Sequence, residues 1–587
     1  MKTLVGLLLL LTAYQSYAAT TDYYTAAVVE YGSPTYPSFS ADEVMLANAA
    51  VFTDFMRNAS LSEVDIIVFP EGGLSGHNVR KSIELPSPEE KANPCTESTK
   101  YHTALVLLSC AAKKYNMYAV INTGEQYYSS TTNKTEYYNS NVAIDKNGTV
   151  VARYRKFNPY GEPVTKPALD LHTFTTDFNV TFGMFICFDI DFEEPGVVLA
   201  RDYGVKHFAF PHCWISELPF LTAIQAQWGF AYSLDTVLLA SGCNYPSSGG
   251  TGSGIYHGRR GALQYFQTNS RTSRLLIANV SKNFEPDNKV FHTKDPARPT
   301  TYKEPVKNVV SNEFSDVEVH LLEDQHTNSS LFLLRDYTDV YRSRQLFPSG
   351  FYPSSASAAP LQDSSLTVTL TTKTTICQGV VCCDFEVRVT SIFNATKPSA
   401  PSRGDDFSRQ FYRLVAFDGV RWYGGGVATG GVQLCGVVSC VNDSISSCGL
   451  RSDDASAQVA TYGQLFKTET RFESVTIIGT FTHNRTFIYP DILTTATGDN
   501  FGALVPSAAF AYEEYPPYNG SIMAYLKINY PIDNLVTAAI YARQFDRDGQ
   551  KRTELPLSSY AHPLPGSIFL LGVFFLLFFN CILSTVH

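Results

Sequence analysis

The sequence of 587 residues contains few charged residues and no concentration of positive charge. Only 17% of the residues are Asp, Glu, Lys or Arg, the formal net charge is −10, and no cluster of Lys and Arg forms a basic arm. Proteins that bind nucleic acid need such clusters to neutralise phosphates, so we expect no nucleic-acid partner. No His/Cys grouping has the spacing of a zinc site, and we expect neither a metal nor a cofactor.

The C-terminal end lacks charge in a more specific way. The stretch "GSIFLLGVFFLLFFNCILSTVH" begins at Gly566 and contains no acidic or basic residue before His587. A receptor with a single span normally carries Lys or Arg directly after it. Small residues and the spacer "YAHPLPGS" precede this stretch, which is typical of a glycosylphosphatidylinositol (GPI) attachment signal. We predict attachment at Ser559, a linker over 546–559 and removal of 560–587; the alternative is a spanning or tail-anchoring helix.

The N-terminal end predicts export. Lys2, the short apolar run "LVGLLLLLTA" and the small residues of "SYA" indicate a signal peptide over 1–18, with a membrane-anchoring helix as the alternative. Asn-x-Ser/Thr sequons spread along the chain predict an exported, glycosylated surface. They lie at Asn58, Asn133, Asn147, Asn179, Asn279, Asn328, Asn394, Asn442, Asn484 and Asn519. We expect the protein at the extracellular face of the plasma membrane, anchored in the outer leaflet.

The number of cysteines predicts a free thiol. Loss of Cys581 with the tail leaves 11 of the 12 cysteines, an odd number for an exported protein. The C-terminal part holds Cys377, Cys382, Cys383, Cys435, Cys440 and Cys448, and the N-terminal half holds Cys95, Cys110, Cys187, Cys213 and Cys243. If the six C-terminal cysteines pair among themselves, with the adjacent Cys382 and Cys383 taking different partners, one thiol of the N-terminal half stays free.

Strand and helix patterns alternate over 22–312. Apolar residues recur at helical spacing over 40–60, and "VDIIVFPE" is a continuously apolar run typical of a strand buried on both faces. "YYNSNVAIDKNGTVVARYRK" predicts a hairpin that turns at 145–148. Further helices are predicted over 96–116, 193–203 and 218–232, and further strands over 23–31, 117–128, 179–190, 205–214 and 235–243. This order predicts a sheet layered with helices.

A second domain is predicted over 313–545. A strand-like alternation over 316–322 and a Ser/Pro/Ala-rich bridge over 347–360 lead into short β-rich runs with Gly-rich turns. We expect this domain to be mainly β. The sequence leaves its role open: blocking access, shaping the pocket, or coupling to the anchor.

Three reactive residues follow predicted strands. Glu71 follows "VDIIVFP", Lys156 ends the hairpin strand, and Cys187 follows the apolar run "FGMFI". Layered α/β folds gather reactive groups at strand ends, so the three side chains are candidates to converge. Each also has a plain interpretation: Glu71 as a turn or cap residue, Lys156 as a solvated loop charge, and Cys187 as a core thiol or half of a disulfide.

Several motifs together resemble a known family. "FPEGGL", "YRKFNPYGEP", "FGMFICFDIDFEEP" and "GTGSGIYHGRRGALQYF", then "VCCDFEVRV", "YRLVAFDGV" and "VQLCGVVSC", resemble the vanin/biotinidase branch of the carbon–nitrogen hydrolase (nitrilase) superfamily. The resemblance covers nearly the whole mature chain. It implies an α/β fold, a four-layer αββα nitrilase-type sandwich over 22–312, followed by a smaller mainly-β domain.

The resemblance also implies the chemistry of an amide hydrolase. Cys187 is the expected nucleophile and forms a thioester, and Glu71 is the expected proton acceptor. Lys156 is expected to stabilise the oxyanion and to favour the thiolate. Three residues are expected to support them: Glu162 by positioning the catalytic groups, Phe188 through its backbone N–H as a second oxyanion donor, and Trp214 as a pocket wall.

One stretch departs from the family pattern. The family usually has a Thr-Ala-Trp-like stretch where this chain has His212, Cys213 and Trp214. We expect Cys213 either to pair with Cys243, or to line the pocket and alter specificity. A Cys/His dyad through His212 is an alternative that accounts for fewer residues than the Glu–Lys–Cys arrangement.

The expected function is extracellular hydrolysis of a linear amide of a vitamin. Pantetheine, cleaved to pantothenate and cysteamine, is the first choice because a lipid tail is typical of vanins. The alternatives are biocytin, as for the biotinidases, and a cell-surface binding protein that keeps the fold without turnover. The sequence does not indicate an oligomeric state.

Overall fold

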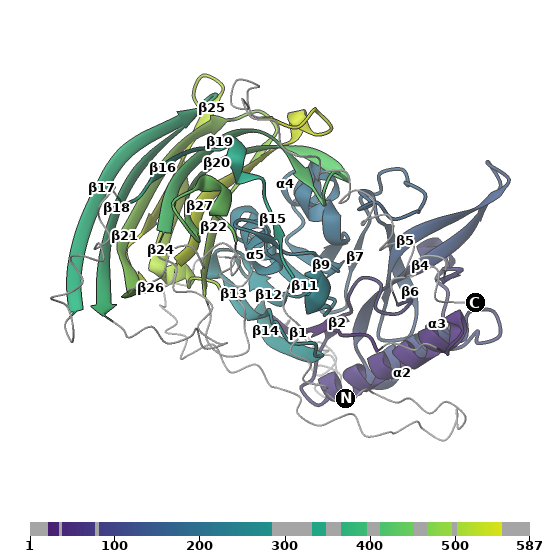
Figure 1. The fold of residues 1–587 in the computed structure, drawn as a ribbon. Helices are drawn as coiled ribbons and strands as arrows, with labels where there is room; N and C mark the ends of the chain where they lie inside the picture. Colours follow the sequence, from purple (N-terminus) through teal and green to yellow (C-terminus); the bar gives the residue numbers. More distant parts are fainter. Residues whose placement is uncertain are drawn as a thin grey trace, which may run out of the picture. The chain divides into compact units, whose positions relative to one another are not determined.

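Figure 1 shows a computed structural model of the chain. The structure describes residues 22–34, 38–76, 81–284, 332–347, 365–395, 411–450, 466–495, 502–533 and 535–554. Several sequence predictions lie outside these residues: the signal peptide, the tail with Ser559, Asn328, the strand over 316–322 and almost all of the bridge over 347–360. Among the described residues, no helix is both long and apolar enough to cross a membrane.

The first sheet of the N-terminal domain contains seven strands in the order β14-β1-β2-β4-β5-β6, with β3 beside β4. These strands are β1 (Tyr23–Glu30), β2 (Ile66–Val68), β3 (Ser82–Ile83), β4 (Tyr118–Ser129), β5 (Lys134–Ile144), β6 (Val150–Arg155) and β14 (Arg274–Ser281). β2 is parallel to β1 and β4 and is buried throughout, as its apolar sequence predicted. Helices α2 (Ala41–Ser60) and α3 (Thr103–Tyr115) share a buried apolar cluster with this sheet.

The sequence predicted the start of α2 correctly and the start of α3 wrongly. Ser40 caps α2 through a capping box with Glu43, as predicted for the helix over 40–60. The helix predicted over 96–116 begins only at Thr103, so its first turns were predicted wrongly. The cause is local: the Asn93 side chain accepts a hydrogen bond from the Thr96 N–H and holds a turn there.

The second sheet has six strands in the order β13-β12-β11-β9-β8-β7. They are β7 (Thr173–Thr175), β8 (Thr181–Met184), β9 (His207–His212), β11 (Val237–Gly242), β12 (Ser253–His257) and β13 (Ala262–Phe266). Helices α4 (Val198–Arg201) and α5 (Ala223–Leu234) accompany it, and its inward side chains join one apolar cluster with those of the first sheet. Two facing sheets with helices outside them confirm the predicted αββα sandwich.

The strand predicted over 179–190 is shorter than expected. β8 ends at Met184, and Cys187–Asp191 form a turn of 3₁₀-helix. The helix predicted over 193–203 divides into a π-helical turn, Glu193–Val197, and α4. The apolar run therefore ends in a sharp change of direction, and Cys187 lies at its corner.

The C-terminal domain is a sandwich of two antiparallel sheets with the orders β16-β19-β20-β27-β22-β23 and β17-β18-β21-β25-β24, with β26 beside β21. The first comprises β16 (Arg342–Gln345), β19 (Phe411–Tyr423), β20 (Ala428–Cys440), β22 (Thr486–Thr495), β23 (Gly502–Ala503) and β27 (Leu535–Gln544). The second comprises β17 (Ser365–Gln378), β18 (Val381–Ala395), β21 (Phe466–Thr482), β24 (Phe510–Glu514), β25 (Ser521–Ile528) and β26 (Ile532–Asp533). The mainly-β prediction is confirmed.

Disulfides follow the predicted division of the cysteines. The C-terminal pairs are Cys377–Cys382, Cys383–Cys435 and Cys440–Cys448, so the two adjacent cysteines do take different partners. The Cys383–Cys435 bond joins β18 to β20 and thus the two sheets of the sandwich. The N-terminal pairs are Cys95–Cys110 and Cys213–Cys243. Within the described chain this leaves Cys187 as the free thiol.

The two domains pack directly against each other within the unit that ends at Arg552. Gln225 of α5 donates a hydrogen bond to Asp491 of β22 (2.5 Å), and Thr537 of β27 donates one to the carbonyl of Pro219 (2.7 Å). Gly229 of α5 lies against the ring of Tyr489, where an added Cβ would come within 2.4 Å of a ring carbon. A side chain at Gly229 would therefore force the domains apart.

Candidate active site

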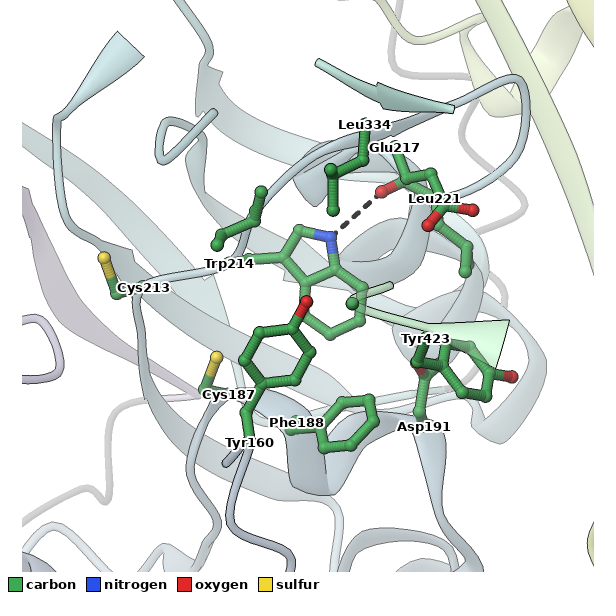
Figure 2. A pocket seen from close by; sticks show the side chains of 12 residues that line it. Tyr160, Cys187, Phe188, Asp191, Cys213, Trp214, Glu217, Leu221, Leu334 and Tyr423 are labelled. Atoms are coloured by element: carbon green, nitrogen blue, oxygen red, sulfur yellow. Dashed lines mark hydrogen bonds between the residues drawn. The ribbon is translucent and has the colours of Figure 1, made fainter. Parts of the chain in front are cut away.

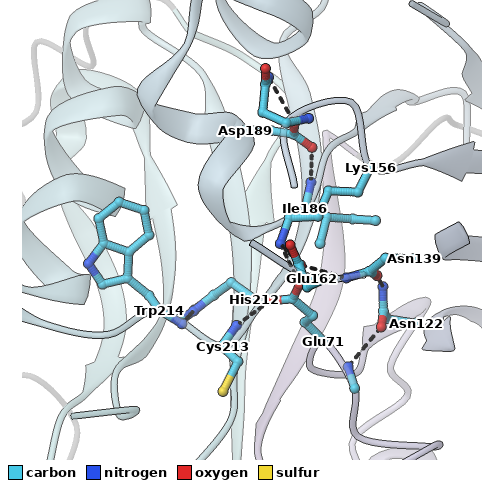
Figure 3. Close-up of polar contacts among 12 residues, drawn as sticks. Glu71, Asn122, Asn139, Lys156, Glu162, Ile186, Asp189, His212, Cys213 and Trp214 are labelled. Atoms are coloured by element: carbon cyan, nitrogen blue, oxygen red, sulfur yellow. Dashed lines mark hydrogen bonds and ion pairs between the residues drawn. The ribbon is translucent and has the colours of Figure 1, made fainter. Parts of the chain in front are cut away.

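Glu71 lies in the turn that follows β2, and three donors hold its carboxylate (Figure 3). Its Oε1 accepts hydrogen bonds from Nδ2 of Asn139 (2.8 Å) and Nζ of Lys156 (2.8 Å). Its Oε2 accepts one from the backbone N–H of Cys213 (2.9 Å). Residues from β5, the end of β6 and the end of β9 thus converge on one buried carboxylate. The turn itself is held by Asn122, whose Oδ1 accepts from the N–H of Gly72 (2.7 Å).

Lys156 directly follows β6 and is only 2% exposed. Its Nζ lies 2.8 Å from Oε1 of Glu71 and 2.5 Å from Oε1 of Glu162. Burial works to lower the pKa of the amine, but the charges of Glu71 and Glu162 more than offset it and leave the pKa well above its ordinary value. Lys156 therefore stays protonated as an ammonium ion.

Cys187 lies at the corner between β8 and the 3₁₀ turn, with a φ of 46°. This left-handed conformation is uncommon and strained for a non-glycine residue, and such strain gathers at functional positions. Asp189 braces the corner, because its Oδ2 accepts from the N–H of Ile186 (2.9 Å) and the hydroxyl of Tyr154 (2.8 Å). Its Oδ1 accepts from the N–H of Asn158 (2.8 Å). The surrounding structure thus holds the thiol in a conformation that the local sequence disfavours.

The environment of Cys187 keeps the thiol protonated. Burial raises the pKa of the Cys187 thiol well above its ordinary value, and the negative charge of Glu71 adds to the rise. The Lys156 ammonium and the N–H of Cys213 act in the opposite direction without offsetting it. Lys156 thus favours the thiolate, as expected, but does not produce one by itself. Attack by sulfur needs a base, and Glu71 interacts directly with the thiol.

The structure places the three supporting residues around this centre. Glu162 contacts Lys156 and lies 3.3 Å from Nδ2 of Asn139, so it bridges the groups that hold Glu71. Trp214 lines the pocket, and its Nε1–H donates to the carbonyl of Leu221 (2.9 Å). Phe188 also lines the pocket, with its ring 4.9 Å from that of Tyr160. The role of the Phe188 backbone N–H stays a prediction.

His212 is not available as a base for Cys187. The ring is buried, and burial lowers its pKa to about 3. Its Nδ1 accepts a hydrogen bond from the N–H of Trp214 (3.2 Å), and its Nε2 lies 2.9 Å from Nε2 of Gln227. A neutral imidazole with both nitrogens occupied supports a structural role, which disfavours the Cys/His dyad.

The pocket beside Cys187 has walls from both domains (Figure 2). Tyr160, Phe188 and Trp214 contribute aromatic surface from the N-terminal domain. Tyr423, at the end of β19, and Gly424 contribute surface from the C-terminal domain. The C-terminal domain therefore shapes the pocket, one of the three roles that the sequence left open.

The two sequence alternatives for Cys213 do not exclude each other, and its effect on specificity stays a prediction. Cys213 pairs with Cys243 and also lines the pocket. Its backbone N–H is the donor to Oε2 of Glu71. The bond to β11 thus fixes the segment that supplies this donor.

Sequence reasoning missed the amides and the aspartate that hold Glu71 and the corner at Cys187. Asn122 and Asn139 lie in long strands, and Nδ2 of Asn122 donates to Oδ1 of Asn139 (2.8 Å). A signal existed, because "VINTGE" and "YYNSNVAI" place amides inside otherwise apolar, buried strands. Buried polar side chains need partners, so such residues mark a network. Asp189 carried a similar signal in "FICFDI".

Comparison with known proteins agrees with this fold. Residues 11–216 match the carbon–nitrogen hydrolase family, and residues 359–548 match the vanin C-terminal domain. The chain is therefore a hydrolase that acts on carbon–nitrogen bonds other than peptide bonds.

Individual relatives define the branch. Vanin-like protein 1 of Drosophila melanogaster is 33% identical over 91% of this chain and 88% of its own length. Vanin-like protein 2 of the same species is 30% identical over 90% of each chain. Biotinidase of Rattus norvegicus is 39% identical over 45% of this chain and 55% of its own length. The chain belongs to the vanin/biotinidase branch of the carbon–nitrogen hydrolases.

Proposed function

We propose that the protein is an extracellular amidohydrolase that cleaves a linear amide through a thioester on Cys187. The observation that carries the proposal is the free, buried thiol beside the Glu71–Lys156 pair at the wall of a pocket. The other cysteines of the described chain are paired. A lone reduced thiol at a strained position with an adjacent base fits a nucleophile better than a packing residue.

Acylation begins with proton transfer from Cys187 to Glu71. The sulfur attacks the amide carbonyl, and the oxygen of the tetrahedral intermediate acquires a negative charge. Lys156, a fixed ammonium ion, stabilises that charge, with the Phe188 N–H as the proposed second donor. When the intermediate collapses, the C–N bond breaks and Glu71 gives its proton to the departing nitrogen. The products of this step are a free amine and a Cys187 thioester.

Deacylation uses the same groups in reverse. Glu71 takes a proton from a water molecule, the oxygen attacks the thioester carbonyl, and the C–S bond breaks. The Cys187 sulfur recovers the proton, and the carboxylic acid leaves. Three hydrogen bonds hold Glu71, which interacts with the thiol, and such a held carboxylate suits a group that acts twice on different partners.

The proposed substrate is pantetheine, hydrolysed to pantothenate and cysteamine. The predicted lipid anchor supports this choice, because a lipid anchor is typical of the vanins. Biocytin is the second candidate, since biotinidases are among the relatives. The third possibility is a binding protein without turnover, against which the intact Glu71, Lys156 and Cys187 arrangement argues.

The proposed location is the outer face of the plasma membrane, with a signal peptide over 1–18 and a GPI anchor at Ser559. Disulfides in both domains support an oxidising compartment. Side-chain accessibility supports glycosylation, because the described sequon asparagines are exposed or half-buried. They are Asn58, Asn133, Asn147, Asn179, Asn279, Asn442, Asn484 and Asn519. The side chain of Asn394 lies outside the described residues.

A side-by-side assay of the purified ectodomain tests the function. We expect hydrolysis of pantetheine at a higher kcat/KM than biocytin, and no turnover by Cys187→Ala. Iodoacetamide should label Cys187 in the wild type, and saturating substrate should protect it. A higher kcat/KM for biocytin would reverse the order of the two substrates. Absence of turnover on both substrates, with unchanged ligand binding by Cys187→Ala, would support the binding protein.

The location needs a separate test. A phospholipase C that cuts phosphatidylinositol should release the protein from intact cells, and Ser559→Leu should reduce its surface display. Retention on the cell after complete phospholipase treatment would favour the spanning helix.

A further inference from the structure

The pocket has two chemically different sides (Figure 2). In this view Cys187 and Cys213 lie on one side, and Asp191, Glu217 and Tyr423 lie on the other, with aromatic rings between them. The mechanism uses only the first side. The second side carries two buried carboxyl groups, with Asp191 3% exposed and Glu217 7% exposed.

One oxygen of Asp191 has no partner. Within the described residues, its Oδ2 makes no hydrogen bond although the side chain is buried and lines the pocket. Its backbone carbonyl, by contrast, accepts from Nε of Arg543 (2.9 Å) and so fixes the residue in place. A buried carboxylate oxygen without a donor is costly. A bound molecule that supplies a hydrogen-bond donor would relieve that cost.

The C-terminal domain holds the neighbouring carboxylate. Arg421 of β19, 3% exposed, forms ion pairs with Glu217 and with Asp336, the latter between Nη1 and Oδ2 at 3.3 Å. Tyr423, two residues further along β19, lines the pocket next to this pair. Glu217 is therefore paired with a guanidinium from the other domain, whereas Asp191 lines the pocket and has one oxygen without a hydrogen bond among the described residues.

The reaction order assigns this side to the acyl part of the substrate. The amine must leave and water must enter while the thioester persists. A thioester on Cys187 keeps the acyl group in the pocket that Cys187 lines, and Asp191 and Glu217 line the same pocket.

We propose that Asp191, beside the Glu217–Arg421 pair, selects acyl groups that carry an uncharged hydrogen-bond donor, such as a hydroxyl or a ureido N–H, and rejects acyl groups that end in a carboxylate. This inference rests on the proposed amidase function. A donor reaches the free Oδ2, whereas an anionic group meets two buried negative charges, and the two nearby guanidiniums are already paired, Arg421 with Glu217 and Arg543 with Asp548. Both vitamin amides considered above fall within the favoured class.

Three anilides with one leaving group and equal chain length test the selectivity: pentanoyl, 5-hydroxypentanoyl and glutaryl anilide. For the wild-type ectodomain we expect kcat/KM for the hydroxyacyl anilide to exceed that of the plain acyl anilide by about 10- to 100-fold, as for a hydrogen bond to a charged group. The glutaryl anilide should be the poorest substrate. Equal values within about threefold for all three would overturn the inference.

Asp191→Asn removes the charge and keeps the shape. We expect the hydroxyacyl preference to fall about tenfold and the glutaryl anilide to gain at least as much. Asp491→Asn is the matched control, because Asp491 is also fully buried with an unpartnered Oδ2 but does not line the pocket. The control should keep the wild-type ranking. An unchanged ranking in Asp191→Asn would overturn the inference.

A pH series on the wild type also tests whether the charge of Asp191 controls the selectivity, without the need for a variant. Burial raises the pKa of the Asp191 carboxyl to about 6, with Arg543 and Arg421 opposing the rise and Asp548 adding to it. The uncharged groups coupled to it are the hydroxyls of Tyr160, Tyr423, Tyr489 and Tyr541. Below pH 6 the carboxyl becomes neutral, so the glutaryl-to-pentanoyl ratio should rise severalfold between pH 7.5 and pH 5. The ratio cancels titration of the catalytic groups, and a flat ratio would contradict the inference.

Failure of the two proposals can be told apart. If the wild type hydrolyses none of the three anilides and neither vitamin amide, the amidase function fails and the selectivity inference fails with it. If the wild type hydrolyses the amides through Cys187 but without the ranking, only the selectivity inference fails.

Discussion

Two buried cations interact with residues that line the pocket, Lys156 with Cys187 and Arg421 with Glu217, and each contacts two carboxylates. Lys156 contacts Glu71 and Glu162, all from the N-terminal domain. Arg421 of the C-terminal domain contacts Glu217 and Asp336. The charge pattern is the same, but the first cluster lies within one domain and the second joins the two domains.

The chemical difference between the Lys156 ammonium and the Arg421 guanidinium suits them to different roles. An ammonium is a compact point charge whose three donors can turn toward a new anion, which suits a group that must meet an oxyanion. A guanidinium presents a rigid planar fork of donors that locks carboxylates in fixed geometry. We infer that Lys156 serves the reaction and that Arg421 serves the shape of the pocket. The following variants test that division.

Lys156→Ala should give the largest effect. Loss of the oxyanion donor, together with two carboxylates left without a counter-charge, should lower kcat by about 10³-fold or more. Steady-state kinetics of the ectodomain measures it, with Lys146→Ala, a surface ion pair with Asp177, as the control expected to stay within about twofold. Near-normal kcat in Lys156→Ala would contradict a catalytic role for Lys156.

Arg421→Ala should act mainly on stability. It leaves Glu217 and Asp336 buried without a cation, which typically costs about 3 kcal/mol or more of the free energy of unfolding. Urea unfolding measures the loss. Arg471→Ala, an exposed arginine 4.0 Å from Asp533, is the matched control and should stay within about 0.5 kcal/mol. A loss in Arg421→Ala no larger than that of the control would show that the domains do not depend on this cluster.

The effect of Asp191→Asn on the free energy of unfolding should depend on pH. The folded-state pKa of about 6 lies above the ordinary value of 3.8 because of burial, so the folded state binds the proton more tightly. The contribution of this carboxyl to stability is fully present below pH 3.8 and is lost as the pH rises through 6. We expect the variant to be more stable than the wild type at pH 7.5, by about 2 kcal/mol, and to lose that advantage at pH 4.5. Thermal unfolding at both pH values checks it, and an advantage independent of pH would contradict the charge argument.

Glu162→Gln should give the smallest effect. The amide still accepts a hydrogen bond from Lys156 but removes one of its two neighbouring charges, so we expect a fall in kcat of about tenfold with KM little changed. Glu162→Ala, which also removes the acceptor, should be worse than Glu162→Gln. If the two variants behaved alike, the acceptor would have no positioning role.

The candidate catalytic residues could be located from the sequence because each is tied to a local pattern. Glu71, Lys156 and Cys187 each follow a run whose apolar or β-rich character marks a strand, and strand ends meet at one edge of a layered fold. The odd number of cysteines by itself indicates a free thiol. Errors occurred where side chains override propensity, as in the turn held by Asn93 before α3 and the corner at Cys187 after β8.

The second side of the pocket could not be predicted in this way. Arg421 and Glu217 are about 200 positions apart, in different domains, and neither lies in a stretch with a distinctive pattern. Cys213 was recognised as unusual, but only the fold showed that one residue can both form a disulfide and line the pocket.

The family, the sandwich with its β domain, the proposed nucleophile and the odd number of thiols follow from the sequence, because these depend on local periodicity, short motifs and counting. Which groups surround Cys187 depends on the tertiary structure. It placed Tyr423 in the wall of the pocket and Arg421 against Glu217, and it left one oxygen of Asp191 without a hydrogen bond among the described residues. The physical reason is that burial and charge pairing act through space, between residues whose separation along the chain carries no information about their contact.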